Sequence, residues 1–418
     1  MNNNEKGKRK IFNDPVYGFI SISSDLHYKL IEHQYFQRLR RIRQLGMSNL
    51  VYPGTNHTRF QHALGAAHLM ESALNVLELK GNEVTRQERE AAIAAILLHD
   101  IGHGPYSHTL ESSLIKGLIH EDISLAFMEV LNDELAGELD LAIEIFKGNY
   151  HKKYLHQLVS GQLDMDRLDY LKRDSFFSGV YEGAIGSDRI IKMLDIRNDE
   201  LVVESKGIYS IEKFLIARRL MYWQVYLHKT VIGAEFLLLK ILNSVKELIK
   251  ANHDVPVTPL FEHLLINDIS RDELLKDHEN RRRIINDFAR LDDSDVIVTL
   301  KMWMNHPDKL LALLAGKFIN RELFKIEISN TPFEEEKMES IKELVKKHYG
   351  FINHDMNYLV FTGSISNNLF SPVHDKIKIL YKNEDIEEID KASDMLYLKE
   401  ISKEVTKYFL CYPKECIW

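Results

Sequence analysis

The sequence is poor in cysteine. Only Cys411 and Cys416 occur among 418 residues, and both stand near the C-terminal end. Two thiols with four residues between them supply neither a disulfide framework nor a four-ligand zinc site. We therefore expect a protein of a reducing compartment, the cytoplasm.

Long hydrophobic runs and excess positive charge are also lacking. No stretch of 18 apolar residues occurs, and no apolar segment follows the basic start MNNNEKGKRK, so we expect neither a membrane span nor secretion. The 54 Lys and Arg against 62 Asp and Glu give a net charge of −8. This net negative charge argues against nucleic acid as a partner, but it allows a local basic pocket that binds phosphate.

What the sequence does contain is apolar residues at helical spacing, in a chain that is 45% hydrophobic and 28% charged. We expect a mostly α fold in three parts. Residues 1–23 form a tail with a strand or hairpin, residues 24–251 form a helical bundle, and residues 252–418 form a smaller α+β portion.

Several elements can be predicted one by one. QYFQRLRRIRQLG has helical spacing and stops at Gly46, and ELVVESKGIYSI suits a hairpin that turns at Lys206-Gly207. Thr85 and Glu88 form the pattern of a capping box ahead of AAIAAILL, which is apolar all round. A helix without a polar face belongs in the middle of a bundle.

That central helix runs into LLHDIGHGPYSHTLE, which is rich in titratable groups. Neighbouring helix residues point about 100° apart, but at a helix end the side chains of His99 and Asp100 can converge on one ion. His103 and His108 follow within one turn and loop, broken by Gly102. An isolated His-Asp pair is more often an ordinary helix end, yet burying so many titratable groups requires a ligand or a metal.

Two other segments offer further ligands. In HTRFQHALG, Arg59 and His62 lie on one helical face, although a lone histidine there is more often a satisfied core residue. In QLDMDRLDYLKRD, Asp166 begins a series of polar residues at helical spacing that could equally be a solvated face. A nitrogen and oxygen ligand set from these segments suits Mn, Fe, Zn, Co or Ni better than calcium or magnesium alone, with an additional Mg possible.

The order of these residues, H…HD…D, resembles the signature of the HD-domain metal-dependent phosphohydrolases. More narrowly, the segments NDPVYG, FQRLRRIRQLG, VYPGTNHTRFQHALG, HDIGHGPYSHTLE and DMDRLDYLKRD resemble the deoxynucleoside triphosphate triphosphohydrolases of that superfamily. These include a type with an added SAM domain, for which we see no counterpart here. The resemblance is specific from about residue 11 to residue 235 and weaker to about residue 400.

The resemblance implies a fold, an activity and a set of site residues. The fold is the HD helical bundle, and the activity is cleavage of a deoxynucleoside triphosphate (dNTP) into deoxynucleoside and inorganic triphosphate. The implied metal ligands are His62, His99, Asp100 and Asp166. The residues implied at the scissile bond are His103, His108, Glu111 and His120, of which His108, oriented by Glu111, protonates the departing 5′ oxygen.

Substrate and activator contacts are implied in the same way. Phosphates are held by Arg59, Arg167 and Arg218 together with His103, and the sugar meets Gln44, Tyr170 and Asp174, while Tyr226 crowds the 2′ position. An activating nucleotide between subunits would meet Glu32, Gln37 and Arg40. We accordingly expect a homo-oligomer, either a dimer or a tetramer.

Other functions stay open at this stage. The chain could hydrolyse another nucleotide, as a nucleotidase or as an alarmone or cyclic-dinucleotide hydrolase. It could also be a non-catalytic module that binds nucleotides or single strands. Four intact ligands argue against the last reading, because a pure binder does not need an open metal site.

Overall fold

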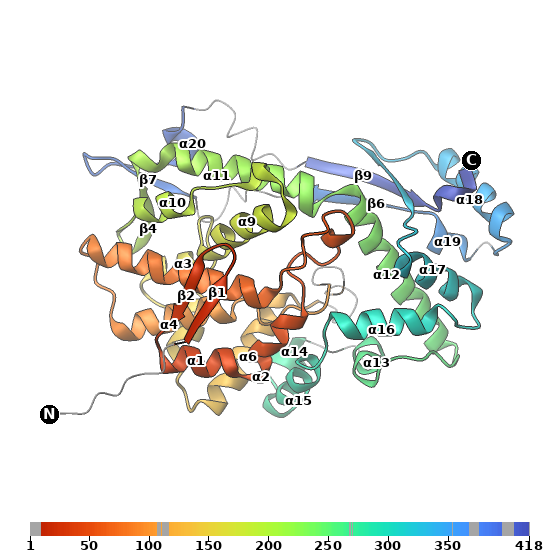
Figure 1. Cartoon of the computed structure of the whole chain (residues 1–418), viewed down its shortest axis with the longest axis horizontal. Helices are drawn as coiled ribbons and strands as arrows, with labels where there is room; N and C mark the ends of the chain where they lie inside the picture. Colours follow the sequence, from red (N-terminus) through yellow and green to blue (C-terminus); the bar gives the residue numbers. More distant parts are fainter. Residues whose placement is uncertain are drawn as a thin grey trace.

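The computed structural model describes residues 10–417, except residues 107–109, 111–116, 267–268, 270, 353, 368–375 and 395–404. The fold is mostly helical, with small sheets at the N-terminus and among the C-terminal elements, and the predicted fold class is confirmed. In Figure 1 the N-terminal bundle fills the left part of the molecule, and the long helix α12 (Lys229–Lys250) lies toward the right, where many of the C-terminal elements gather. None of the helices in the described residues combines the length and apolarity needed to cross a bilayer.

The chain begins with the expected hairpin. Strands β1 (Lys10–Asp14) and β2 (Gly18–Ile22) pair antiparallel, with Asp14 opposite Gly18. Gly18 adopts a φ of +76°, which glycine tolerates without strain. The hairpin lies across the bundle in Figure 1.

The last two turns of helix α4 (Arg86–Leu98) lie at the centre of the bundle because they have no polar face. Every residue from 91 to 98 is buried. Its start is fixed by the expected capping box, in which Thr85 Oγ1 accepts from the Glu88 amide at 3.2 Å and Glu88 Oε2 accepts from the Thr85 amide at 2.8 Å. Helix α3 (Arg59–Leu79) packs against both α4 and α9 (Met165–Ser178), so these three helices form the frame of the site.

The remaining elements surround this frame. Among the described residues, the other helices that precede α12 are α1 (Asp25–Glu32), α2 (Gln34–Gln37), α6 (His120–Glu134), α7 (Asp140–Phe146), α8 (Lys153–Val159), α10 (Ser187–Met193) and α11 (Ile208–Met221). A π-helical turn, η5 (Tyr222–Tyr226), joins α11 to α12. The helices that follow α12 are α13 (Pro259–Ile266), α14 (Arg271–Leu275), α15 (His278–Phe288), α16 (Asp293–Trp303), α17 (Lys309–Ile319), α18 (Glu335–Tyr349), α19 (Met356–Leu359) and α20 (Ile389–Ala392).

Two further sheets include strands from the C-terminal region. One has the order β3 (Leu194–Arg197), β4 (Glu200–Glu204), β7 (Lys378–Leu380), β8 (Ile386–Glu388), and its β4 and β7 pair in parallel. The other has the order β5 (Lys325–Ser329), β9 (Val405–Tyr412), β6 (Phe361–Asn367) and is antiparallel. Strand β7 therefore returns to the bundle, as Figure 1 shows beside β4.

Two predicted elements were wrong in detail. The helix expected to run to Gly46 consists only of α2 and a 3₁₀ turn over Arg38–Arg41 (η1), and the chain is extended at Ile42. Here the Arg59 amide donates to the Ile42 carbonyl at 3.0 Å and the Gln44 amide to the His57 carbonyl at 3.0 Å, so pairing with the start of α3 replaces helical hydrogen bonds.

The hairpin expected at Lys206-Gly207 turns instead at Asn198-Asp199, between β3 and β4. Both turn residues adopt positive φ, 55° and 60°, which asparagine and aspartate tolerate and which matches the twist of a tight hairpin. Residues Ser205–Gly207 form a 3₁₀ turn that leads into α11.

Candidate metal centre and pocket

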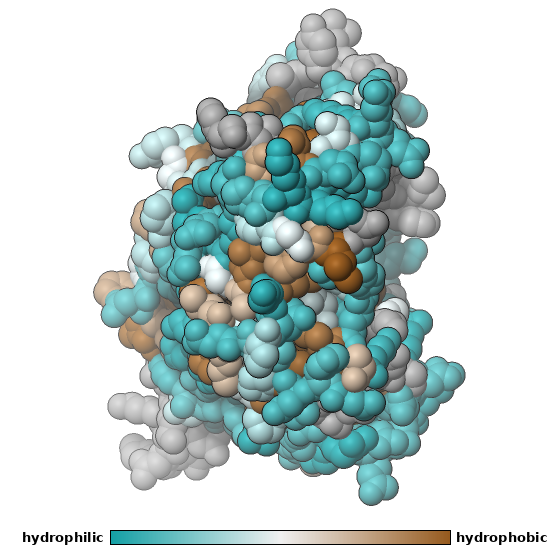
Figure 2. All heavy atoms as spheres, turned by 90° about the vertical axis from the view of Figure 1, so that its right-hand side faces the viewer, coloured by the Kyte–Doolittle hydropathy of each residue, from teal (hydrophilic) through white to brown (hydrophobic). Residues whose placement is uncertain are grey.

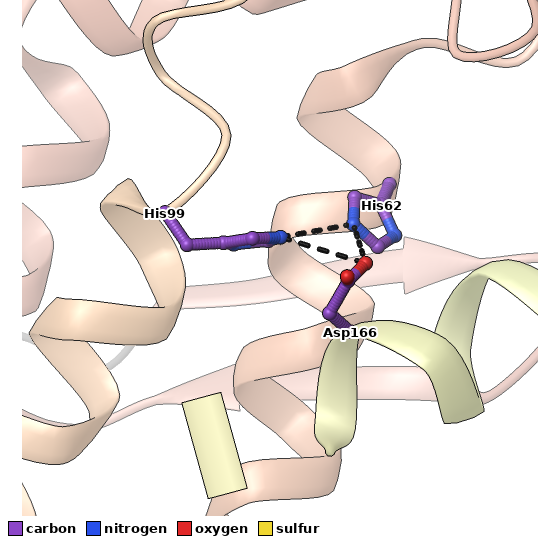
Figure 3. Close-up of side chains that lie close together, drawn as sticks. All are labelled: His62, His99 and Asp166. Carbon is purple, nitrogen blue, oxygen red and sulfur yellow. Dashed lines mark hydrogen bonds and ion pairs between the residues drawn. The ribbon is translucent and has the colours of Figure 1, made fainter. Parts of the chain in front are cut away.

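Three helices bring His62, His99 and Asp166 together (Figure 3). His62 lies on α3, His99 directly follows α4, and Asp166 lies in the first turn of α9. Asp166 Oδ1 is 3.1 Å from His62 Nε2 and 3.5 Å from His99 Nε2, and the two Nε2 atoms are 3.5 Å apart. Ligand atoms that share one ion at about 2.1 Å lie roughly 3.0–3.4 Å from each other, so this spacing fits a single metal ion.

The far side of each imidazole has its own acceptor. His62 Nδ1 is 2.7 Å from Asp169 Oδ2, and His99 Nδ1 is 2.6 Å from the Ile96 carbonyl oxygen. An acceptor at Nδ1 holds a ring proton there and leaves Nε2 as the atom that binds either a second proton or a metal ion. The two Nε2 atoms face each other across 3.5 Å, so a cation, either a proton or a metal ion, is needed between them. This donor set of nitrogen and carboxylate oxygen suits a divalent transition metal.

Asp100 borders this group and links it to a second one. Its Oδ1 is 3.3 Å from His99 Nε2 and 3.2 Å from His103 Nε2, while its Oδ2 is 3.6 Å from His62 Nε2 and accepts from Arg59 Nη1 at 2.5 Å. Asp100, His103 and His120 offer ligand atoms that lie within 4.8 Å of one another. The rings of His103 and His120 stack at 3.9 Å, nearly parallel.

The charge of the site attracts cations. Burial disfavours the protonated form of His62, but the carboxylates of Asp166 and Asp169 outweigh it and raise its pKa to about 10. Burial raises the pKa of the Asp166 carboxyl, but hydrogen bonds to His62 and His99 outweigh it and hold that pKa well below its usual value. Burial and the nearby Arg59 lower the pKa of His103 far enough to keep that ring neutral at pH 7.

A cavity of about 560 Å³ opens beside these residues, within the size range of small-molecule sites. The predicted site residues that line it are Gln44, Arg59, His99, Asp100, His103, His120, Asp166, Arg167, Tyr170, Asp174 and Tyr226. Metal-binding groups, cationic groups and the residues predicted to meet a sugar therefore share one pocket.

The part of the pocket around Asp174 is held by a small hydrogen-bond network. Asp174 Oδ1 is 2.8 Å from His57 Nε2, and Asp174 Oδ2 accepts from the Tyr226 hydroxyl at 2.8 Å. The Tyr170 ring meets the Tyr226 ring edge-on at 6.1 Å. Burial raises the pKa of both phenols well above the usual value, so both hydroxyls stay protonated donors.

Other predicted residues lie elsewhere. Arg218 is buried, donates to Gln162 Oε1 at 3.2 Å and is not among the described residues that line the pocket. Glu32 is exposed and pairs with Lys10, while Arg40 Nε donates to Gln37 Oε1 at 2.8 Å. The predicted catalytic residues His108 and Glu111 lie outside the described residues.

Sequence reasoning missed several residues that support the site. Arg173 Nε and Nη2 donate to both oxygens of Asp169 at 2.9 and 3.0 Å, and Arg173 Nη1 donates to Asp14 Oδ2 at 2.7 Å. The spacing of Asp169 and Arg173, four residues apart on one helix, was a usable signal for their pairing. Asp14 stands in the segment NDPVYG, but no pattern pairs it with Arg173, and nothing in the sequence points to Glu235, which also lines the pocket.

Comparisons with known proteins agree with this geometry. The HD domain family matches residues 59–174, and the HD-associated region matches residues 185–254. The crystal structure of a phosphohydrolase from Bacteroides thetaiotaomicron is 52% identical, covers 97% of this chain and all of its own, and superposes with a TM-score of 0.92.

Curated relatives point the same way. The chain is 32% identical to the uncharacterized protein YwfO of Bacillus subtilis, over 99% of this chain and 94% of that protein. It is 28% identical to the deoxynucleoside triphosphate triphosphohydrolase SAMHD1 homolog of Dictyostelium discoideum, over 66% of this chain and 57% of that protein. The chain belongs to the HD-domain phosphohydrolases, the family whose metal-binding signature its histidines and aspartates resemble.

Proposed function

We propose that the protein cleaves dNTPs into deoxynucleoside and inorganic triphosphate with the help of a divalent transition metal. The observation that carries the proposal is the arrangement along α9, where Asp166, Tyr170 and Asp174 follow one another at successive turns and all line one pocket. One end of this series meets the histidines of the metal centre, and the other meets Tyr226. This order matches a substrate with a phosphate at one end and a sugar at the other.

In this proposal His62, His99, Asp100 and Asp166 hold the metal. When bound, the metal supplies Lewis-acid chemistry, because it lowers the pKa of water and neutralises charge on phosphate oxygens. Arg59 and Arg167 line the pocket as cations for the non-bridging oxygens. The Arg59 guanidinium is oriented by its hydrogen bond to Asp100, so it can meet a phosphate beside the metal centre.

The histidines of the site are proposed to bind phosphate and to protonate the leaving group. His103 is buried and neutral, so it has a single N–H, which is directed at Asp100. This N–H can donate to phosphate when Asp100 binds the metal. His120 stacks on it and lies 3.4 Å from Glu121. By resemblance, His108, with Glu111 to orient it, protonates the departing 5′ oxygen.

Selection of deoxyribose over ribose is assigned to Tyr226. Its hydroxyl is fixed on Asp174 and its ring is held between Tyr170 and Tyr222, at centroid distances of 6.1 and 5.1 Å. A ring held from two sides cannot move to admit an extra hydroxyl. Gln44, Tyr170 and Asp174 supply polar contacts for the sugar.

Product analysis tests the activity. The purified protein is incubated with each dNTP and NTP and with Mn²⁺, Fe²⁺ or Mg²⁺, and the products are separated by ion-exchange chromatography. We expect triphosphate and deoxynucleoside from dNTPs, and no product from the Asp166→Ala variant. Release of orthophosphate or pyrophosphate would show that a different phosphate bond is cleaved. Turnover only of nucleoside monophosphates, alarmones or cyclic dinucleotides would show that the substrate belongs to another class.

We also propose a cytoplasmic homo-oligomer, a dimer or a tetramer, regulated by an activating nucleotide that meets Glu32, Gln37 and Arg40. Two observations support it. Glu32 and Arg40 are exposed, and Gln37 is half-buried and hydrogen bonded to Arg40, so all three side chains reach the surface. Figure 2 shows hydrophobic side chains gathered across the middle of the face that carries the C-terminal elements. Light scattering with and without GTP or dGTP tests both parts.

A further inference from the structure

Glu235 is a pocket residue that the proposed mechanism does not use. It lies in the second turn of α12, four residues after Val231, and both side chains line the cavity. The neighbouring residues Ala234, Leu237 and Leu238 belong to the buried core. Glu235 is therefore a partly buried carboxyl group on an otherwise apolar stretch of the helix, with its side chain at the pocket.

The other acidic residues that line the described pocket all have partners. Asp100 meets Arg59, Asp166 meets His62, Asp174 meets Tyr226, and Glu121 meets His120. Within the described part of the chain, the Glu235 carboxyl has no hydrogen-bond or ion-pair partner. Burial alone raises the pKa of this group to about 7, and nothing offsets it. A carboxyl that lines the pocket and has no donor among the described residues can accept hydrogen bonds from a ligand that brings N–H groups.

The residues around Glu235 indicate which part of the substrate this side chain can contact. The stretch that leads to it lines the pocket with Tyr222, Tyr226, Leu227 and Val231. The cationic groups Arg59 and Arg167 come from α3 and α9 instead. A carboxylate repels phosphate, whereas aromatic and aliphatic side chains pack well against a flat heterocycle. The site is therefore suited to the nucleobase.

We propose that Glu235 is a specificity-determining residue that accepts hydrogen bonds from the nucleobase and favours guanine; this inference rests on the proposed function. Guanine carries two adjacent donors, N1–H and the N2 amino group, which match the two oxygens of one carboxylate. Adenine and cytosine each place one amino group beside a ring acceptor, and thymine places one N–H between two carbonyl oxygens. Among these bases only guanine satisfies both oxygens of the ionised group, and its two N–H donors keep the bound carboxylate ionised.

The isosteric variant Glu235→Gln tests the proposal. A carboxamide offers one acceptor beside one donor, which matches adenine and cytosine and mismatches guanine. Equimolar mixtures of the four dNTPs are digested, and the ratios of kcat/KM are taken from the deoxynucleosides released. We expect the preference for dGTP over dATP to fall by roughly tenfold to a hundredfold in the variant.

Glu247→Gln is the matched control, because Glu247 is an exposed glutamate on the same helix. Glu247→Gln should leave the ratios unchanged. Glu235→Gln should unfold at a temperature no lower than the wild type, since it removes an acidic side chain that is partly buried and has no partner among the described residues. An unchanged dGTP to dATP ratio in Glu235→Gln overturns the inference. If the wild type cleaves no dNTP, the proposed function fails instead, and calorimetric titration with dGTP and dATP still decides whether Glu235 distinguishes the bases.

Discussion

His62 is connected to the N-terminal hairpin by a series of charged side chains. Its Nδ1 meets Asp169, Asp169 is held by two hydrogen bonds from Arg173, and Arg173 also donates to Asp14 at the end of β1. All of these groups are buried, so their hydrogen bonds act in a medium of low dielectric constant. Asp169 therefore fixes both the tautomer and the direction of a metal ligand without touching the metal itself.

Replacing Asp169 by alanine should weaken metal binding. Loss of the acceptor at His62 Nδ1 frees the ring to rotate and to change tautomer, and such changes lower metal affinity by about 10- to 100-fold. Titration of the metal-depleted protein with Mn²⁺ measures this affinity. Asp188→Ala, which removes an exposed carboxylate on α10, is the control and should bind metal as the wild type does. Equal affinity of Asp169→Ala and Asp188→Ala would contradict the role given to Asp169.

At this scale the sequence could predict the residues with a local pattern but not their partners. His62, His99 and Asp166 stand in motifs that can be read directly, and they meet at 3.1 to 3.5 Å. Asp14 and Arg173 are 159 positions apart, and no rule of spacing pairs two residues across such a distance. The supporting contacts depend on tertiary packing, which a single sequence does not display.

Among the elements, the turn after α4 decides where two of the proposed ligands point. Arg38 of η1 is fully buried and donates to the carbonyl oxygens of Ile101 and His103, both at 2.8 Å. On the other side, Ser124 of α6 accepts from the Gly102 amide at 2.9 Å and donates to the His99 carbonyl at 2.6 Å. The turn is therefore held between two elements, and its shape does not depend on α4 alone.

Replacing Arg38 by lysine should destabilise the protein. Lysine cannot reach both carbonyl groups in the geometry of a guanidinium, and a buried acceptor without a donor costs about 1–3 kcal/mol. Urea unfolding followed by circular dichroism measures the loss. Arg41→Lys is the control, because Arg41 lies on the same turn but is half exposed and pairs with Asp292. We expect the control to change the free energy of unfolding by less than about 0.5 kcal/mol, and equal stability of the two variants would contradict the role of Arg38.

The elements also show where sequence patterns succeed and where they fail. Helix α4 was predictable because its capping box and its apolar run are local. The prediction of a helix through Gly46 was wrong because the hydrogen bonds of Ile42 and Gln44 with the residues at the start of α3 outweigh the local helix propensity. Glycine is a common turn residue, so the sequence predicts the turn of the hairpin at Lys206-Gly207. The observed turn is formed by Asn198 and Asp199, which adopt the positive φ that it requires.

For the whole molecule, the metal centre joins segments that are far apart in the sequence. His62, His99 and Asp166 come from three helices that pack around one core. These three side chains lie close enough to share one cation, since the two histidine nitrogens face each other at 3.5 Å and the Asp166 carboxylate faces both. A metal bound there links α3, α4 and α9, so its binding free energy becomes part of the stability of the bundle.

Removal of the metal should therefore lower the melting temperature. A ligand present at 100 times its Kd adds about 2.7 kcal/mol to the stability of the folded state, provided that it does not bind the unfolded chain. Dialysis against a chelator, followed by thermal unfolding with and without added Mn²⁺ or Fe²⁺, measures the shift. The Asp166→Ala variant should unfold at one temperature whether metal is present or not, because it lacks the carboxylate that faces both histidines. If the wild type unfolds at the same temperature before and after chelation and readdition, these residues do not form a metal centre that stabilises the bundle.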